Sequence, residues 1–186
     1  MTVTRRKDTR TPRVLMHKVA DIRGGVSVNV SELGGDFLKE GSVLSAPVSG
    51  ISHVIKVADV VAEVTATGKT IKVKKGHNFK ADDFVMLDVN SVAVKISSID
   101  ESNNDYDTIT VASALGAIAL GGQLVEAKEA STDASALKYI PLAISGTGKP
   151  VKANTNLDVD AWLIAVTKDN ALPACVTKYL TGIINY

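Results

Sequence analysis

The sequence predicts a mainly β fold, with a small β-barrel inserted in an outer β-rich domain and a short helix near the C-terminus. Segments that alternate between apolar and polar residues recur roughly every 8 to 12 residues, which is typical of a sandwich or barrel. Aromatic residues make up only 4% of the 186-residue chain, so the core must be built from Val, Ile, Leu and Ala. Helical periodicity is sparse before the last segment of the chain.

The first strands are expected in the first third of the chain. Residues 26–30 alternate between apolar and polar side chains, the period of a half-buried strand. Residues 43–48 and 51–57 have the composition of two further strands around the turn Ser49-Gly50. These segments would belong to the outer domain.

The middle of the chain has the clearest strand signals. Residues 71–74 alternate with their lysines on one face, and residues 106–111 alternate in the same way. Residues 84–87 and 92–96 flank Asn90-Ser91, which predicts a hairpin. The polar run 100–105 is expected to be a surface loop.

Helical signals are confined to two places. Residues 113–120 are short and contain Gly116, which allows a single helical turn at most. Near the C-terminus, Pro173 suits the first turn of a helix. The spacing of the apolar residues that follow predicts one buried helical face, which consists of Cys175, Val176, Tyr179 and Leu180. Gly182 predicts the end of this helix, before a short closing strand at 183–184.

Composition changes along the chain predict three parts. Residues 67–127 hold a complete set of short strands, and residues 127–136 are small and polar like a linker. We therefore expect an inserted barrel at 67–127 and an outer domain made from 24–66 plus 128–186. The linker-like stretch has an alternative interpretation as an ordinary helix turn, in which case there is no insertion.

Residues 1–23 form a basic arm on an acidic body. They carry seven basic and two acidic residues, a net charge of +5, whereas the other 163 residues have a net charge of −4. Such an arm is either a frayed, solvated terminus or an anchor for an acidic surface or a phosphate.

No set of residues forms a recognisable catalytic or metal-binding motif. His17, His53 and His77 lie far apart in the sequence, whereas zinc needs three or four converging ligands. Cys175 lies on the predicted apolar face, where a free cysteine acts as a small hydrophobe. The acidic loop 100–107 has no glycine at the turn that a calcium loop requires. We expect no enzymatic activity, no cofactor and no metal.

Nucleic-acid and membrane binding are disfavoured. The lysine-rich segment 69–80 contains one aromatic residue, Phe79, but Asp82, Asp83 and Asp88 follow at once, and the net charge of the chain is only +1. An exposed lysine-rich strand also serves to prevent edge pairing. No apolar run approaches the 18 residues of a transmembrane helix, and the N-terminus lacks a secretory pattern, so we expect synthesis in a cytoplasm.

Three stretches resemble a known family. They are residues 71–87, which include the turn Gly76-His77-Asn78-Phe79, residues 93–127 and residues 159–186. Together they are similar to the head fibre or capsid decoration proteins of tailed phages and prophages of gut Bacteroidetes. The chain departs from the family at Ala81-Asp82, where the family has a Gly-Asp pair.

The resemblance implies a virion structural protein without catalytic residues. Such a protein is made in the bacterial host cytoplasm, docks on the major capsid protein at the outside of the head, and self-associates, most often as a homotrimer. The arm then becomes the candidate capsid contact, through Arg5, Arg6, Lys7, Arg10 and Arg13. The alternative is a β-barrel module that binds surface glycans or host envelope components. Glycan sites use exposed aromatics, and we expect Trp162 in the core instead.

Overall fold

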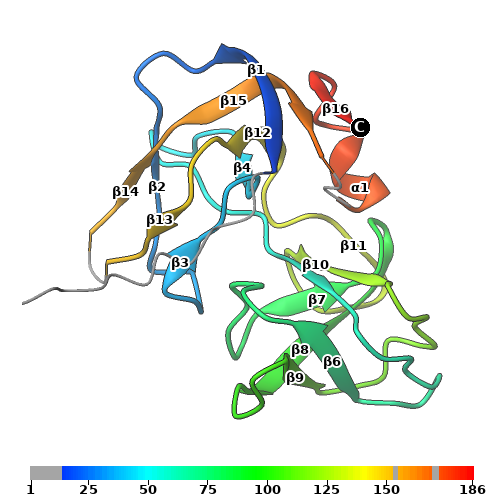
Figure 1. Ribbon diagram of the computed structural model, residues 1–186. Coiled ribbons are helices and arrows are strands. Elements are labelled where there is room, and N and C mark those ends of the chain that lie inside the picture. The colour runs from blue at the N-terminus through cyan, green and yellow to red at the C-terminus, as the bar shows by residue number, and fades with distance from the viewer. Residues whose placement is uncertain (1–13, 153–154, 169–171) are drawn as a thin grey trace, which may run out of the picture.

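The computed structural model describes residues 14–152, 155–168 and 172–186. Within these residues the fold is mainly β with one short helix, which confirms the predicted fold class at this level. Figure 1 shows two halves, one above the other. We call described residues 14–56 and 136–186 the upper half and residues 57–135 the lower half.

The upper half contains a five-stranded sheet with the order β1-β15-β12-β4, in which β16 pairs with β15 in parallel. Two small two-stranded sheets, β13-β3 and β14-β2, extend beside it. The bounds are β1 (Leu15–Asp21), β2 (Val26–Val28), β3 (Phe37–Leu38), β4 (Val43–Ser45), β12 (Pro141–Ser145), β13 (Lys149–Pro150), β14 (Leu157–Val159), β15 (Ala161–Thr167) and β16 (Ile183–Asn185).

The lower half contains a seven-stranded antiparallel sheet with the order β5-β10-β7-β8-β9-β6, in which β11 pairs with β8. The bounds are β5 (Val57–Asp59), β6 (Thr70–Lys74), β7 (Phe84–Met86), β8 (Ser91–Asp100), β9 (Tyr106–Val111), β10 (Gln123–Ala127) and β11 (Ser131–Ser135). The sheet thus takes in β5 and β11, which lie outside the predicted insertion 67–127.

The predicted barrel is not confirmed, because the sheet does not close. Its end strands β5 and β6 approach each other only at the isolated bridge between Val60 and Val73, where the Val61 N–H also donates to the Lys72 carbonyl at 2.9 Å. The chain turns away directly after Val61. A barrel needs a continuous ladder at every strand pair, so one bridge leaves an open sheet.

Two hydrophobic clusters explain why β7 and β10 of the lower sheet are buried on both faces. One cluster lies within the lower half and includes Ile71, Ile109 and Leu124. A second cluster joins the halves, since it packs Met86 and Val125 of the lower sheet with residues of the upper sheet and the C-terminal segment. Successive residues of β10 therefore face different cores, which explains its continuous apolar sequence.

The C-terminal segment is shorter and less regular than predicted. Helix α1 (Ala174–Thr177) has four residues, and Pro173 precedes it as the N-cap instead of lying in its first turn. Val176 and Leu180 are buried as expected, but Tyr179 is 41% exposed. A single turn cannot maintain one apolar stripe over two turns, so the chain continues through turns to β16.

Four other expectations need correction. Residues 113–120 form no helix, and residues 51–57 make isolated bridges instead of a long strand. The linker-like stretch contains β11, because an edge strand needs only its backbone groups to pair and tolerates small polar side chains. The predicted arm is partly structured, since β1 pairs along β15.

Candidate functional site

The junction between the two halves holds a network of polar contacts. A turn of the lower half, residues 75–80, docks on a loop of the upper half, residues 31–39. The Gly34 N–H donates to the Asn78 carbonyl at 2.9 Å. A Cβ on Gly34 would stand 2.1 Å from the Phe79 carbonyl oxygen, so no other residue fits without displacing the backbone. The turn and the loop are therefore matched in shape.

Lysine side chains cross the junction in both directions. Lys39 reaches down and donates to the Lys75 carbonyl at 2.7 Å, while Lys80 reaches up to the Ser31 carbonyl at 2.9 Å. Gly76, with φ +77°, makes room for Lys39, whose Cε and Nζ would each be 2.4 Å from an added Cβ. Partial burial, together with the nearby ammonium of Lys74, lowers the pKa of Lys39 below its usual range.

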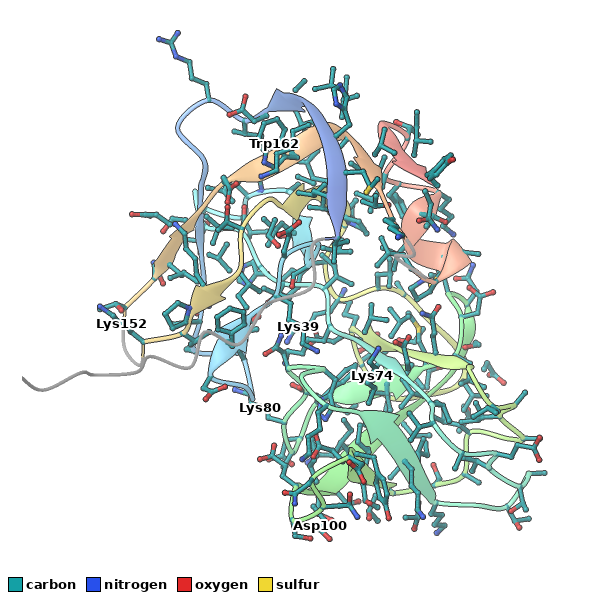
Figure 2. The ribbon with its side chains drawn as sticks, viewed as in Figure 1. Lys39, Lys74, Lys80, Asp100, Lys152 and Trp162 are labelled. Atoms are coloured by element: carbon teal, nitrogen blue, oxygen red, sulfur yellow. The ribbon has the colours of Figure 1, made fainter. Side chains whose placement is uncertain are left out.

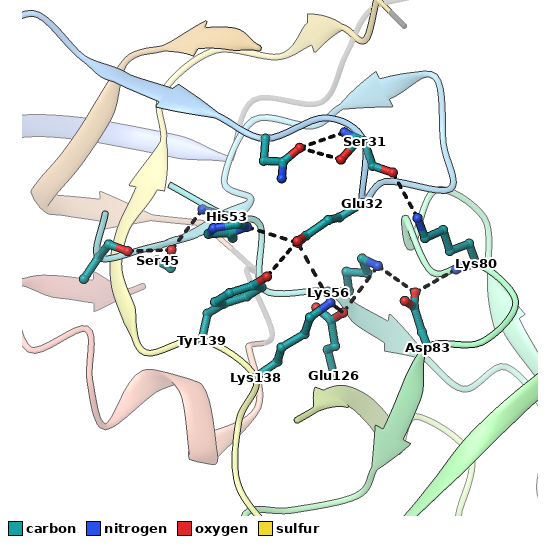
Figure 3. Close-up of polar contacts among 12 residues, drawn as sticks. Ser31, Glu32, Ser45, His53, Lys56, Lys80, Asp83, Glu126, Lys138 and Tyr139 are labelled. Atoms are coloured by element: carbon teal, nitrogen blue, oxygen red, sulfur yellow. Dashed lines mark hydrogen bonds and ion pairs between the residues drawn. The ribbon is translucent and has the colours of Figure 1, made fainter. Parts of the chain in front are cut away.

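A buried lysine lies at the centre of the junction (Figure 3). The Lys56 side chain is fully buried, and its Nζ lies 2.6 Å from Asp83 Oδ2 and 3.3 Å from Glu126 Oε1. The Asp83 carboxylate also accepts the Lys80 N–H at 2.9 Å. Burial raises the pKa of Glu126, and the opposing charge of Lys56 limits that rise. Three charged groups are thus buried together, where each depends on the others.

The network continues into the upper half through Lys138 and Glu32. Lys138 Nζ lies 2.9 Å from Glu126 Oε1 and 3.9 Å from Glu32 Oε2. The Tyr139 hydroxyl donates to Glu32 Oε1 at 2.7 Å, and His53 Nδ1 lies 3.1 Å from Glu32 Oε2. Burial alone would raise the pKa of Glu32, but Tyr139 and Lys138 outweigh it and hold the pKa low. His53 is stacked on Tyr139 and is buried in the junction.

A second polar group surrounds His77 in the docking turn. Its Nδ1 accepts the Phe79 N–H at 3.0 Å, and its Nε2 lies 3.4 Å from Asp107 Oδ2. Lys75 Nζ lies 2.6 Å from Asp107 Oδ1. Burial lowers the pKa of His77, although Asp107 opposes this. The imidazole thus supports the turn through Nδ1, while its Nε2 lies near Asp107 without a hydrogen bond.

An open cleft of about 720 Å³ lies beside these contacts, between the two halves. Five lysines line it, namely Lys39, Lys56, Lys74, Lys75 and Lys168, together with the acids Glu40 and Asp59. Figure 2 labels Lys39 and Lys74, which lie between the upper and lower halves. The cleft is therefore the place in the described structure that combines volume with cationic groups.

The residues singled out from the sequence are not gathered at one site. Arg5, Arg6, Lys7, Arg10 and Arg13 lie outside the described residues. Cys175 is buried, and burial raises the pKa of its thiol, which disfavours the reactive thiolate. Trp162 is partly buried against the shared core, with Lys18 Nζ 5.2 Å from its ring centroid.

The described residues contain no cluster of three or more His, Cys, Asp or Glu arranged to hold a metal. Their one helix is far too short to span a membrane.

Sequence reasoning missed the charged network itself. Lys56 and Glu126 each interrupt an apolar run, at 54–58 and 124–127. A charged residue inside an apolar strand is a signal of a buried ion pair, because an isolated charge is too costly to bury. Which acid faces which base depends on tertiary packing, and no local pattern records it.

Comparison with protein-family models, with curated proteins and with solved structures finds no match to this chain.

Proposed function

We propose that the protein is a non-enzymatic structural protein of a phage or prophage virion. In this role it docks on the major capsid protein at the outside of the head, as a head fibre or a decoration protein. The supporting observation is the resemblance of residues 71–87, 93–127 and 159–186 to such proteins. Two of these stretches supply the docking turn and the acids Asp83, Asp107 and Glu126, each of which is paired with a lysine.

The position of β1 fits an attachment role for the N-terminal arm. β1 is an edge strand of the upper sheet and lies within the arm, residues 1–23. Met16 and Val19 on this strand are 57% and 60% exposed. An exposed edge strand with apolar side chains offers both backbone and side-chain contacts to a neighbouring chain. The arm residues Arg5, Arg6, Lys7, Arg10 and Arg13 would then contact the acidic capsid surface beyond it.

Self-association as a homotrimer belongs to the same proposal. Large exposed aliphatic side chains lie on three adjacent strands, with Ile164 on β15 and Ile184 on β16 beside those of β1. Exposed apolar groups on neighbouring strands favour burial against another subunit. Sedimentation equilibrium tests this, and a 19.5 kDa monomer at high concentration would contradict it.

Co-sedimentation with purified heads of the phage that carries the gene tests the attachment role. The full chain is expected to sediment with the heads, and a chain lacking residues 1–13 is expected to bind less. Binding through the arm should weaken as salt rises, because exposed charges are screened beyond about 8 Å at physiological ionic strength. No co-sedimentation at any salt concentration would refute the attachment role. Equal, salt-insensitive binding by both chains would refute the role of the arm.

The second candidate is a binding module for surface glycans or host envelope components. The cleft between the halves is the observation that favours it. In this proposal the lower sheet, whose ends meet at Val60 and Val73, acts as a small barrel-like module. Binding to a panel of host envelope glycans, with no binding to heads, would favour this candidate over the first.

A further inference from the structure

The cleft has the size and the walls of a small-molecule site. Its volume of about 720 Å³ falls within the range of about 300–1,000 Å³ that is usual for ligand pockets. The upper half contributes Phe37, Lys39, Val54 and Ile55 to its lining, and the lower half contributes Lys74. The cleft thus offers apolar contact together with a few charged groups.

Ion pairs within the protein neutralise two of its five lysines. Lys56 is paired with Asp83 and Glu126, and Lys75 is paired with Asp107. Lys39, Lys74 and Lys168 make no ion pair with any of the residues that the structure describes. Within the described parts of the chain, three ammonium groups in the cleft are therefore without a counter-charge in direct contact.

The two acids of the cleft are hydrogen-bonded to neutral donors. Glu40 accepts the N–H groups of Val14 and Leu15 at 3.1 and 2.8 Å, and Asp59 accepts the Gln123 side-chain amide at 2.8 Å. Neither acid lies within ion-pair distance of the three lysines. Three ammonium groups and two carboxylates give the cleft a small positive charge. It therefore suits a polar ligand with one anionic group better than a polyanion.

We propose that the cleft binds a small monoanionic sugar, a sugar phosphate or uronic acid, whose anionic group contacts Lys39 and Lys74. Both lysines project from opposite halves, so the ligand bridges the junction. Hydroxyl groups of the sugar donate to the free lone pairs of Glu40 and Asp59. Burial lowers the pKa of Lys39, and the nearby ammonium of Lys74 lowers it further. An anion that lies between the two ammonium groups offsets their repulsion.

The inference does not depend on the virion role. A head-bound protein and a free binding protein would both use the same cleft. Failure of sugar binding leaves the co-sedimentation experiment unaffected, and failure of co-sedimentation leaves the sugar titration unaffected.

NMR titration of the full-length ¹⁵N-labelled chain tests the proposal. The probes are glucose 6-phosphate, glucuronate, inorganic phosphate and neutral glucose. We expect saturable shifts of amides at residues 37–43 and 74–78 with both anionic sugars, weaker binding of phosphate, and no binding of glucose. Equal affinity for phosphate and glucose 6-phosphate would overturn the sugar part of the proposal.

A matched pair of lysine variants locates the site. Lys74→Met removes an ammonium group from the cleft. Lys72→Met removes one from the same exposed face of β6, but the Lys72 Nζ lies over the Tyr106 ring, 4.7 Å from its centroid. Lys74→Met is expected to weaken binding about tenfold, the usual effect of losing one charged hydrogen bond, and Lys72→Met should leave it unchanged. Lys39→Met should also weaken binding about tenfold in a protein that still folds, as its melting temperature reports. Equal affinities of the Lys72 and Lys74 variants would overturn the proposed site.

Discussion

Replacing Lys56 with Met tests whether the junction depends on its buried charge. Lys56 is fully buried, and its partners Asp83 and Glu126 have side chains that are only 6% and 1% exposed. Breaking a buried pair typically costs about 3–5 kcal/mol, because a charge is left without compensation. Asp83 keeps the Lys80 N–H as a donor, and Glu126 keeps the Lys138 Nζ. We therefore expect the free energy of unfolding to fall by an amount near the lower value, about 3 kcal/mol.

Lys95→Met is the matched control. Lys95 Nζ lies 2.7 Å from Asp82 Oδ1, almost the same distance as in the Lys56 pair, but the two side chains are 49% and 79% exposed. Exposed pairs contribute at most about 1 kcal/mol, since water already solvates both charges. Urea unfolding at pH 7 should therefore separate the two variants by about 2 kcal/mol or more. Equal losses in the two variants would refute the argument from burial.

The effect of Lys56→Met should also depend on pH. Without the lysine, the pKa of Glu126 rises further above its unfolded value, so the folded variant takes up a proton more readily. A group whose pKa is higher in the folded than in the unfolded state stabilises the protein at a pH below the unfolded-state pKa. That stabilisation is lost as pH rises through the folded-state pKa. The deficit relative to the unmodified protein should thus shrink as pH falls from 7 toward about 4.5, the usual carboxyl value. A deficit that grows over this range would contradict the assignment.

Three further predictions concern packing and titration. Gly34→Ala should cost about 3 kcal/mol in urea unfolding, because its Cβ would overlap the Phe79 carbonyl; a loss below 0.5 kcal/mol would show that the loop yields freely. Leu180→Ala should cost about 2–5 kcal/mol, whereas Ile184→Ala, at a side chain that is 62% exposed, should cost well under 1 kcal/mol; equal losses would contradict the burial of the C-terminal segment. The His77 imidazole, followed by NMR, should titrate below pH 6.5, because burial lowers its pKa. Since the folded-state pKa is depressed, the contribution of His77 to stability should be lost as pH falls below 6.5 through the folded-state pKa. A titration midpoint above 6.5 would show that Asp107 dominates over burial.

The docking turn gives a physical reason for the distinctive run Gly76-His77-Asn78-Phe79. Gly76 adopts a positive φ and leaves room for Lys39, while Phe79 is buried in the lower core. Asn78 has φ 62°, a conformation that asparagine tolerates better than most residues. Gly76 therefore serves the contact between the halves, while Asn78 and Phe79 fix the conformation and position of the turn.

The alternation of apolar and polar residues was sufficient to predict the strands that are buried on one face. β6 and β9 alternate in burial along their whole length, and the sequence alternates with them. The hairpin turn at Asn90 was also predictable, since Asn90 adopts the left-handed conformation that such turns require. The mainly β class and the burial of Cys175 follow from the same local information.

Only the tertiary structure decided which strands pair and which charged side chains meet. β11 is polar and resembles a linker, yet it pairs with β8 because backbone groups, not side chains, form the ladder. The open end of the lower sheet depends on where the chain turns after Val61, which no alternation in the sequence records. Lys56 meets Asp83 and Glu126, which are 27 and 70 positions away, only when the two halves are packed together. The sequence by itself determined which segments extend and which side chains avoid water, because these preferences are local. Strand order, the buried charge network and the lysine-lined cleft arise from contacts between distant segments, and they exist only in the folded chain.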